Sequence, residues 1–315
     1  MKRYFGALSL VVALLFCANM AVAANSEMVQ IKGSDTLINL VQKLAEVYMQ
    51  KHPGANIAVT GGGSGTGIAA LVNRKCDIAD ASRGIKASEV ADANSKGIDP
   101  KRVIVAIDGL SIIVNAQNPV SKLTVEEIGK IYRGEAKNWS EFGGNNAPIA
   151  LYGRQSNSGT YDFMKENVMK GEYATSMKSM NGNAQIVEAI KQDVSGIGYV
   201  GVGYAQSATG ITALKVAANP AMGYYDPFNP SDVKNGKYPI TRPLNQYMDG
   251  MPKGIVKNFI EFELSGEGQK IVEDQGFFSI PDEYQRYDDG TLGRTNEVRE
   301  PGAMKKYPVE GQYSK

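Results

Sequence analysis

The sequence predicts an α/β protein of two lobes, because strands and helices alternate along the chain and the chain is long. Three times a short apolar strand leads into a loop of Gly, Ser and Thr, and then into apolar residues at helical spacing. Such alternation is typical of a sheet covered by helices on both sides. A chain of 315 residues exceeds the size at which a single core usually stops growing, so we expect two lobes.

The three strand–loop–helix units have the same order of elements. The predicted strands are Met28–Ile31, Ile57–Thr60 and Ile149–Tyr152; the loops are Gly33–Thr36, Gly61–Gly67 and Arg154–Thr160; the helices start at Leu37, Ile68 and Tyr161. Ser34 or Asp35 is expected to cap the first helix, since both residue types are favoured at that position.

Two further segments are predicted to flank the crossings between the lobes. The apolar runs 104–107 and 110–115 meet at Asp108-Gly109, and the Gly-rich run 196–201 precedes the strand-like residues 211–216. We therefore expect a discontinuous first lobe and an inserted second lobe. The expected ranges are residues 24–110 and 206–284 for lobe 1, residues 111–205 for lobe 2, and residues 285–315 for a polar C-terminal tail.

The first residues have the pattern of a secretory signal peptide. Lys2 and Arg3 precede an apolar stretch from Ala7 to Ala18, and Ala21-Val22-Ala23 supplies a small-residue exit. The apolar stretch is too short to span a bilayer. Cys17 raises the alternative of a lipoprotein, but Phe16 is too large for such a signal. We expect residues 1–23 to be removed after Ala23 and the product to be periplasmic.

Composition excludes several classes of function. Removing Lys2 and Arg3 with the signal peptide lowers the net charge from +1 to −1, which argues against a nucleic acid or a membrane surface as partner. Only Cys76 then remains, so no intramolecular disulfide can form. His52 is the only histidine, which leaves little for a His-based catalytic unit or a zinc site. We expect no metal and no cofactor.

The three loops predict a site for an anion. The first turn of a helix leaves backbone N–H groups unpaired and carries a partial positive charge, and Gly lets an oxyanion approach the backbone. Arg154 precedes the third loop, and its planar guanidinium can hold two oxygens of a phosphate. Each loop alone could be an ordinary cap or a flexible turn. No Gly-Lys-Ser/Thr closes residues 61–67, so a nucleotide triphosphate site is not expected.

At these loops the chain resembles the phosphate-binding proteins of Pst-type ABC transporters, from about Val29 to Pro281. The matching motifs are Ile31-Lys32-Gly33-Ser34-Asp35-Thr36, Gly63-Ser64-Gly65-Thr66-Gly67, Ala81-Ser82-Arg83, and Arg154-Gln155-Ser156-Asn157-Ser158-Gly159-Thr160. The resemblance implies a type II periplasmic-binding-protein fold, with two doubly wound lobes on two hinge strands that close over dehydrated phosphate. It also implies delivery to the permease of an ABC transporter, without catalysis. We expect a monomer.

The residues expected at the phosphate come from these motifs. They are Ser34, Asp35, Thr36, Ser64, Ser82, Arg154, Ser158, Gly159 and Thr160. Ser82 departs from the family, in which an aspartate accepts the proton of hydrogen phosphate and excludes sulfate. A hydroxyl can accept that proton but cannot repel an ionised anion, so Asp35 or Asp80 is considered as the carboxylate instead. Arg83 is either a second cation at the site or a salt-bridged residue at its rim.

Three alternatives remain open at this point. Sulfate or another tetrahedral oxyanion could be the cargo in the same fold. A sensor could use the cleft as a switch without transport, since a fold does not fix a function. A secreted phosphatase could use Ser64 or Ser158 as nucleophile, but it would need an activating base or a metal that the sequence does not offer.

Overall fold

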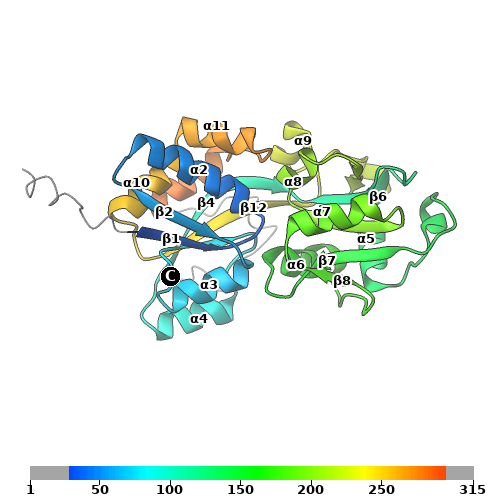
Figure 1. Ribbon diagram of the computed structural model, residues 1–315, viewed down its shortest axis with the longest axis horizontal. Helices are drawn as coiled ribbons and strands as arrows, with labels where there is room; N and C mark the ends of the chain where they lie inside the picture. Colours follow the sequence, from blue (N-terminus) through cyan, green and yellow to red (C-terminus); the bar gives the residue numbers. More distant parts are fainter. Residues whose placement is uncertain (1–27, 296–315) are drawn as a thin grey trace, which may run out of the picture.

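The computed structural model describes residues 28–295, so the expected signal peptide and residues 296–315 of the expected tail lie outside the described part. The described chain forms two lobes side by side, each with its own β-sheet and its own helices (Figure 1). This confirms the predicted α/β class with two lobes. Between residues 28 and 295 no helix has the length and apolar character needed to cross a membrane.

The first lobe is built on a mixed five-stranded sheet. Its strands are β1 (Met28–Gly33), β2 (Asn56–Thr60), β3 (Ile78–Ala81), β4 (Pro100–Gly109) and β12 (Thr241–Asp249), and its helices are α2 (Ile38–Lys51), α3 (Ser64–Val72), α4 (Ala87–Ser95), α10 (Gly254–Glu263), α11 (Gly266–Asp274) and α12 (Asp282–Thr291). The order is β2-β1-β3-β12-β4; β1 runs parallel to β2 and β3, and β12 is antiparallel to β3 and β4. Helices α2, α10 and α11 lie on one side of the sheet and α3 and α4 on the other (Figure 1).

The second lobe has a five-stranded sheet in the order β10-β5-β9-β7-β8. Its strands are β5 (Ser111–Asn115), β7 (Ala150–Arg154), β8 (Lys178–Met180), β9 (Gly196–Val200) and β10 (Ile211–Ala213), its helices are α5 (Val125–Arg133), α6 (Gly159–Phe163), α7 (Asn183–Gln192) and α8 (Val202–Gln206), and β6 (Lys122–Thr124) pairs with β11 (Lys215–Ala217). The short helix α6 continues as one π-helical turn, Met164–Met169.

Between β11 and β12 the chain forms two short helical segments. They are the 3₁₀ turn Pro220–Met222 and α9 (Pro230–Lys234), and a further 3₁₀ turn, Trp139–Phe142, follows α5 in the second lobe. Each of these three segments begins with an Asn whose side chain accepts hydrogen bonds from the first backbone N–H groups. Such a cap satisfies N–H groups of the first turn, so a short helical segment can form even where its residues have little intrinsic helix propensity.

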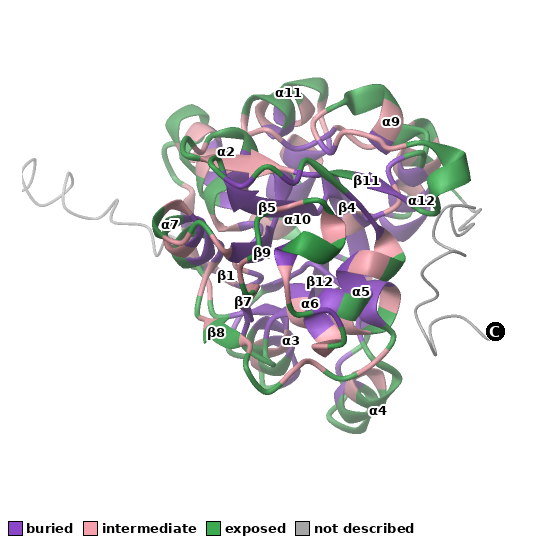
Figure 2. Cartoon of the chain, turned by 90° about the vertical axis from the view of Figure 1, so that its right-hand side faces the viewer, coloured by how far each residue is buried: buried purple, intermediate pink, exposed green. Residues whose placement is uncertain are grey.

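The two crossings between the lobes lie next to each other. Residue Leu110 joins β4 to β5, and its N–H donates to the carbonyl of Ile240, directly before β12, at 3.0 Å. The hydroxyl of Tyr238 donates to the carbonyl of Leu110 at 2.7 Å. Figure 2 shows buried residues on the strands near this junction, while helices such as α4 and α11 are largely exposed. The lobes are therefore hinged through a well-buried, hydrogen-bonded junction.

Two sequence expectations differ from the structure. The second lobe was expected to end at residue 205, but β10 still pairs with β5, because its apolar side chains complete that sheet. Residues from 285 were expected to form a polar tail, but α12 extends to Thr291. Its Tyr287 and Asp288 are fully buried, and the Asp288 carboxylate accepts the N–H of Ile104 at 2.9 Å. Residues 285–291 thus form a packed helix, because a few side chains at helical spacing are buried although the segment as a whole is polar.

Two carboxyl groups are buried together in the core of the first lobe. The amide nitrogen of Gln246 donates to Asp80 at 3.1 Å and to Glu263 at 3.2 Å, and all three side chains are almost fully buried. Burial raises the pKa of Asp80 to about 8, although the Gln246 hydrogen bond opposes this shift. Burial and the nearby Asp80 raise the pKa of Glu263 well above its usual range. Both groups therefore favour the protonated form when folded.

The pair predicts that stability falls as the pH rises. An Asp80 carboxyl with a folded pKa near 8 and an unfolded pKa near 4 binds its proton more tightly when folded, so stability is full below about pH 4 and is lost up to about pH 8. Asp80→Asn removes this loss. The difference between the free energies of unfolding of this variant and of wild type should therefore increase in favour of the variant, by at least about 1.4 kcal/mol, when the pH is raised from about 5 to about 9. Urea unfolding at several pH values measures this.

The control is Asp92→Asn, which removes an exposed carboxylate paired with Lys96 on α4. Its stability relative to wild type should stay constant over the same pH range, because surface pairs contribute little. Parallel pH curves for wild type and Asp80→Asn would contradict the assignment of the proton to the buried pair.

Candidate anion-binding site

Hydroxyl groups from both lobes meet at one point between the sheets. The Ser34 hydroxyl donates to Ser82 Oγ at 2.9 Å, and Ser64 Oγ lies 3.4 Å from Ser82 Oγ. From the second lobe, Thr160 Oγ1 lies 3.4 Å from Ser82 Oγ and 3.2 Å from Thr36 Oγ1. These five residues, called the hydroxyl cluster below, are all buried. The structure thus brings together residues that the sequence assigned to separate loops.

The local fold explains why these hydroxyls converge. Ser34 and Ser82 follow the adjacent parallel strands β1 and β3, whose carboxyl ends lie at the same edge of the sheet. Ser64 is the first residue of α3, and the N–H of Gly63 before it donates to the carbonyl of Gly33 at 2.8 Å. Thr160 is in the first turn of α6, which follows β7 of the other sheet. Both lobes therefore present a strand end or a helix start.

Two hydroxyls of the cluster, and the nearby hydroxyl of Ser158, accept a hydrogen bond from a backbone N–H. Ser64 Oγ accepts the N–H of Ser82 at 3.1 Å, and Ser34 Oγ accepts the N–H of Thr36 at 3.3 Å. Ser158, the cap of α6, accepts the N–H of Thr160 at 3.2 Å. A hydroxyl that accepts from N–H keeps its own proton to donate elsewhere. The site is therefore biased toward donation, which suits a ligand with several acceptor oxygens.

Arg154 lies at the end of β7 and is buried, with 2% of its side chain exposed. Its Nη2 donates to the carbonyl of Asn181 at 2.8 Å, and its Nη1 lies 3.4 Å from Asp35 Oδ2 across the lobes. Its Nε and Nη1 are buried and make no hydrogen bond with any residue from 28 to 295. Burial lowers the pKa of Arg154, while Asp35 raises it. Buried donors without acceptors are costly, so this guanidinium is suited to an added anion.

Asp35 has a different role from the cap that the sequence predicted. Helix α2 begins after Leu37, and no side chain caps it. The Asp35 carboxylate instead reaches the second lobe, where its Oδ2 accepts the N–H of Asn183, the first residue of α7, at 2.9 Å. The Tyr204 hydroxyl donates to the Asp35 carbonyl at 3.0 Å. Asp35 therefore ties the first lobe to two segments of the second and stays close to Arg154.

Sequence reasoning missed Arg242 on β12, a buried arginine that contacts the hydroxyl cluster. Its Nε and Nη2 donate to Asp108 Oδ2 at 2.9 and 2.8 Å, its Nη1 donates to the carbonyl of Ser82 at 3.0 Å, and its Nη2 also donates to Thr160 Oγ1 at 3.0 Å. Asp108 Oδ1 accepts the N–H of Val202 at 2.8 Å. Burial lowers the pKa of Arg242, and Asp108 raises it. The sequence offered one signal for this pair, namely that Asp108 lies within an apolar strand-like segment.

Glycines allow the two lobes to come this close. A Cβ on Gly159 would overlap Ser64 Oγ and lie 2.9 Å from Ser82 Oγ, and a Cβ on Gly63 would lie 2.5 Å from the carbonyl oxygen of Asn157. Gly63 also has a φ of 94°, which glycine adopts readily. Asn157 Nδ2 in turn donates to the carbonyl of Gly62 at 2.8 Å. The contact between lobes depends on backbone approaching backbone.

Several residues considered from the sequence lie away from the hydroxyl cluster. The Thr66 hydroxyl donates to the carbonyl of Gly62 and is exposed. Asp80 Oδ1 accepts from Gln246, in the core. Arg83 is buried in ion pairs with Glu89 and Asp162, which favours the salt-bridged one of its two interpretations. None of these three side chains contributes to the cluster.

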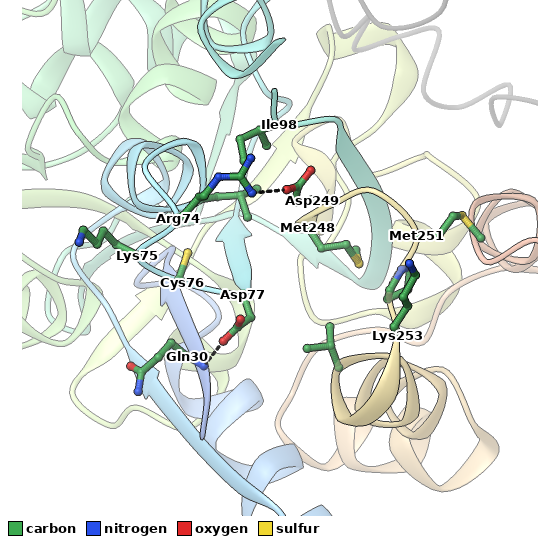
Figure 3. Close-up of a pocket in the computed structure, with 13 residues that line it drawn as sticks. Gln30, Arg74, Lys75, Cys76, Asp77, Ile98, Met248, Asp249, Met251 and Lys253 are labelled. Carbon is green, nitrogen blue, oxygen red and sulfur yellow. Dashed lines mark hydrogen bonds and ion pairs between the residues drawn. The ribbon is translucent and has the colours of Figure 1, made fainter. Parts of the chain in front are cut away.

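A hollow of about 510 Å³ lies at the opposite edge of the first sheet, around the start of β3 and the end of β12 (Figure 3). Arg74 pairs with Asp249 at 3.0 Å, and Asp77 accepts the N–H of Gln30 at 2.7 Å. Burial raises the pKa of the Cys76 thiol to about 12, which disfavours the reactive thiolate form. The polar groups of the hollow are thus largely paired with one another.

Sequence comparisons match the chain to known proteins. The sequence profile of the PBP superfamily domain matches residues 18–267. Phosphate-binding protein PstS of Pseudomonas aeruginosa is 32% identical over 267 residues, which cover 79% of this chain and 82% of that protein. Phosphate-binding protein PstS of Staphylococcus haemolyticus is 31% identical over 258 residues, 80% of either chain.

Solved structures give the same result. A substrate-binding protein assigned to a phosphate ABC transporter of Clostridium perfringens, solved with bound phosphate, has a TM-score of 0.73 at 29% identity and covers 81% of this chain and 100% of that chain. An ABC-type phosphate transport receptor from Vibrio cholerae has a TM-score of 0.65 at 28% identity and covers 80% of this chain and 100% of that chain.

The Asp108–Arg242 pair predicts a large and rescuable loss of stability. Arg242→Met leaves the Asp108 carboxylate buried without its cation, which should lower the free energy of unfolding by about 3–5 kcal/mol. Adding Asp108→Asn should recover part of this loss, because the uncompensated charge is removed. Urea unfolding of the single and double variants measures both values.

The control is Arg294→Met, which breaks partly exposed ion pairs with Asp289 and Glu261. It should cost about 1 kcal/mol or less. If Arg242→Met cost no more than this control, the buried pair would not have the importance given to it here.

Proposed function

Because the chain belongs to the PBP superfamily, and within it to the family of PstS phosphate-binding proteins, we propose that it binds inorganic phosphate between its lobes and delivers it to an ABC transporter. The observation that carries this proposal is that the buried Nε and Nη1 of Arg154 make no hydrogen bond with a residue from 28 to 295, while the buried Ser64 hydroxyl accepts a backbone N–H and keeps its own proton to donate. Phosphate offers four oxygens to such donors. Charge-assisted hydrogen bonds of this kind are the strong ones.

We propose that the phosphate contacts come from the three loops and from the residue after β3. The residues proposed to bind phosphate are Ser34, Asp35, Thr36, Ser64, Ser82, Arg154, Ser158, Gly159 and Thr160. Asp35 acts through Arg154 and through the closure of the lobes. Arg242 is a positioning residue: by donating to Thr160 Oγ1, it directs the proton of that hydroxyl outward.

The cellular setting follows from the same proposal. Residues 1–23 would be a signal peptide cleaved after Ala23, and the mature protein would work in the periplasm as a monomer. Its partners would be the permease subunits of the transporter. The relatives called phosphate-binding protein PstS support this setting, and the range 24–110 for the first part of lobe 1 remains a prediction of the same kind.

We also propose that the protein is a binding protein without catalytic activity. His52 stacks on Tyr48 at the end of α2, where its Nδ1 contacts the Tyr48 carbonyl, so it activates neither Ser64 nor Ser158. Within residues 28–295, no three His, Cys, Asp or Glu side chains form a cluster able to hold a metal ion. These features favour binding over hydrolysis.

The test of the function is calorimetry on refolded, ligand-free protein with phosphate, sulfate and arsenate. Arg154→Ala should weaken phosphate binding more than tenfold, because the charge-assisted hydrogen bonds that it removes are worth about 1.5–3 kcal/mol. Arg154→Lys should also lose affinity, since the planar fork is lost. Arg74→Ala, at the opposite edge of the first sheet, is the matched control.

Wild-type affinity in Arg154→Ala would remove this residue from the site. No phosphate binding by the refolded wild type would overturn the function itself, and tight binding of sulfate alone would change the cargo to that anion.

Ser82 predicts a weaker preference for phosphate over sulfate than a carboxylate would give. Hydrogen phosphate carries a proton that sulfate lacks, and a carboxylate accepts it while repelling a fully ionised anion. Ser82→Asp should therefore raise the ratio of phosphate to sulfate affinity at least about tenfold at neutral pH. Competition binding with both ions measures the ratio, and Ser140→Asp, on the surface, is the control. An unchanged ratio would show that Ser82 does not face the ion.

A further inference from the structure

Four charged side chains form an ion-pair cluster that spans the lobes beside the proposed site. Asp162 Oδ2 lies 2.9 Å from Arg83 Nε and 2.8 Å from Lys86 Nζ. Arg83 Nη1 and Nη2 donate to the two oxygens of Glu89 at 2.8 and 2.7 Å. Arg83, Lys86, Glu89 and Asp162 are called the cross-cleft cluster below.

The two lobes contribute unequally to this cluster. Arg83 directly follows Ser82, and Glu89 lies in the first turn of α4, where it also accepts the N–H of Lys86 at 2.8 Å. These three residues belong to the first lobe and hold one another in position. Asp162 alone comes from the second lobe, two residues after Thr160 in α6. Within this cluster, separation of the lobes would break only the contacts of Asp162 with Arg83 and Lys86.

Partial burial makes these contacts stronger than ordinary surface pairs. The side chains of Arg83 and Asp162 are 7% and 11% exposed, whereas Lys86 is 43% exposed. Burial alone would lower the pKa of Arg83, but Glu89 and Asp162 outweigh it and raise that pKa. Ion pairs that water screens poorly contribute more than exposed ones. The charges of the cluster also balance, two positive against two negative.

We propose that the cross-cleft cluster holds the lobes closed over the bound anion and thereby sets the rate at which the anion leaves. This inference rests on the proposed function, since it concerns the residence time at that site. Arg83 is engaged by protein groups: its Nη1 and Nη2 donate to Glu89, its Nη1 also donates to the carbonyl of Gly84, and its Nε pairs with Asp162. We therefore assign it to the closure of the lobes and not to the anion. The cluster acts after encounter, so it affects dissociation more than association.

The experiment compares phosphate release from wild type and Asp162→Asn by stopped-flow competition. The dissociation rate of the variant should be about tenfold higher at low salt, with an association rate within about threefold of wild type. Raising the ionic strength from about 20 mM to about 500 mM should speed release from wild type much more than from the variant, because salt screens only charged contacts. A merely structural role of Asp162 would not produce this difference in salt dependence.

Two further variants complete the design. Lys86→Gln, at a more exposed position, should also speed release, and its effect should be smaller in the Asp162→Asn background, because both changes remove the same contact. Glu172→Gln removes an equal charge from the second lobe, where Glu172 is exposed and pairs with Lys165, and should leave the release rate unchanged.

The outcomes separate this inference from the function. If wild type binds phosphate and Asp162→Asn releases it at the wild-type rate with the same salt dependence, the cluster has no such role. If wild type binds no phosphate, the proposed function fails. Small-angle scattering of the ligand-free proteins then decides: a larger radius of gyration for Asp162→Asn supports the cluster, and equal radii overturn it.

Discussion

The buried pair of Asp108 and Arg242 is the interaction on which the rest of the structure depends. It lies where β4 and β12 approach the second lobe, and besides bonding to each other the two side chains bind residues of both lobes. Asp108 holds the N–H of Val202 at the start of α8. Arg242 holds the carbonyl of Ser82 and the hydroxyl of Thr160, one in each lobe. A buried charge pair is a weak source of stability, but it allows one arrangement of its neighbours. Here that arrangement fixes hinge and site together.

The hydroxyl cluster gains its chemical character from what lies behind it. A serine hydroxyl in isolation can donate or accept equally well. Because Ser64 and Ser158 accept from backbone N–H groups and Thr160 accepts from a guanidinium, their protons are left for a ligand. The backbone thus converts neutral side chains into directed donors. This explains how a chain with a net charge near zero can present a site for an anion without a general positive field.

Local patterns in the sequence predicted the α/β class, the two lobes and most of the loops, because each loop joins a strand to a helix within a few residues. They could not predict Arg242 as a partner of Asp108, since 134 residues separate the two and only the folded hinge brings them together. They predicted Ser34 or Asp35 as the cap of the first helix, whereas the Asp35 carboxylate accepts the N–H of Asn183 in the other lobe. They also predicted a polar tail from residue 285, because the buried Tyr287 stands among polar neighbours. Partners distant in sequence decided each miss.

Arg154 and Arg242 are both matched by carboxylates, and this determines how the proposed site can discriminate. Asp108 balances Arg242, and Asp35 lies 3.4 Å from Arg154, so the two guanidinium groups carry little net charge toward a ligand. Attraction to the anion must then come largely from directed hydrogen bonds, whose number and geometry differ between ligands. Hydrogen bonds distinguish a protonated from an unprotonated oxyanion better than net charge does. If the anion has one proton too few or too many, one buried donor or acceptor of the site is left without a partner, which is costly. The hydroxyl of Ser82 can rotate either to donate or to accept a hydrogen bond. It is therefore the position at which the site best tolerates both a protonated and an unprotonated oxygen of the anion.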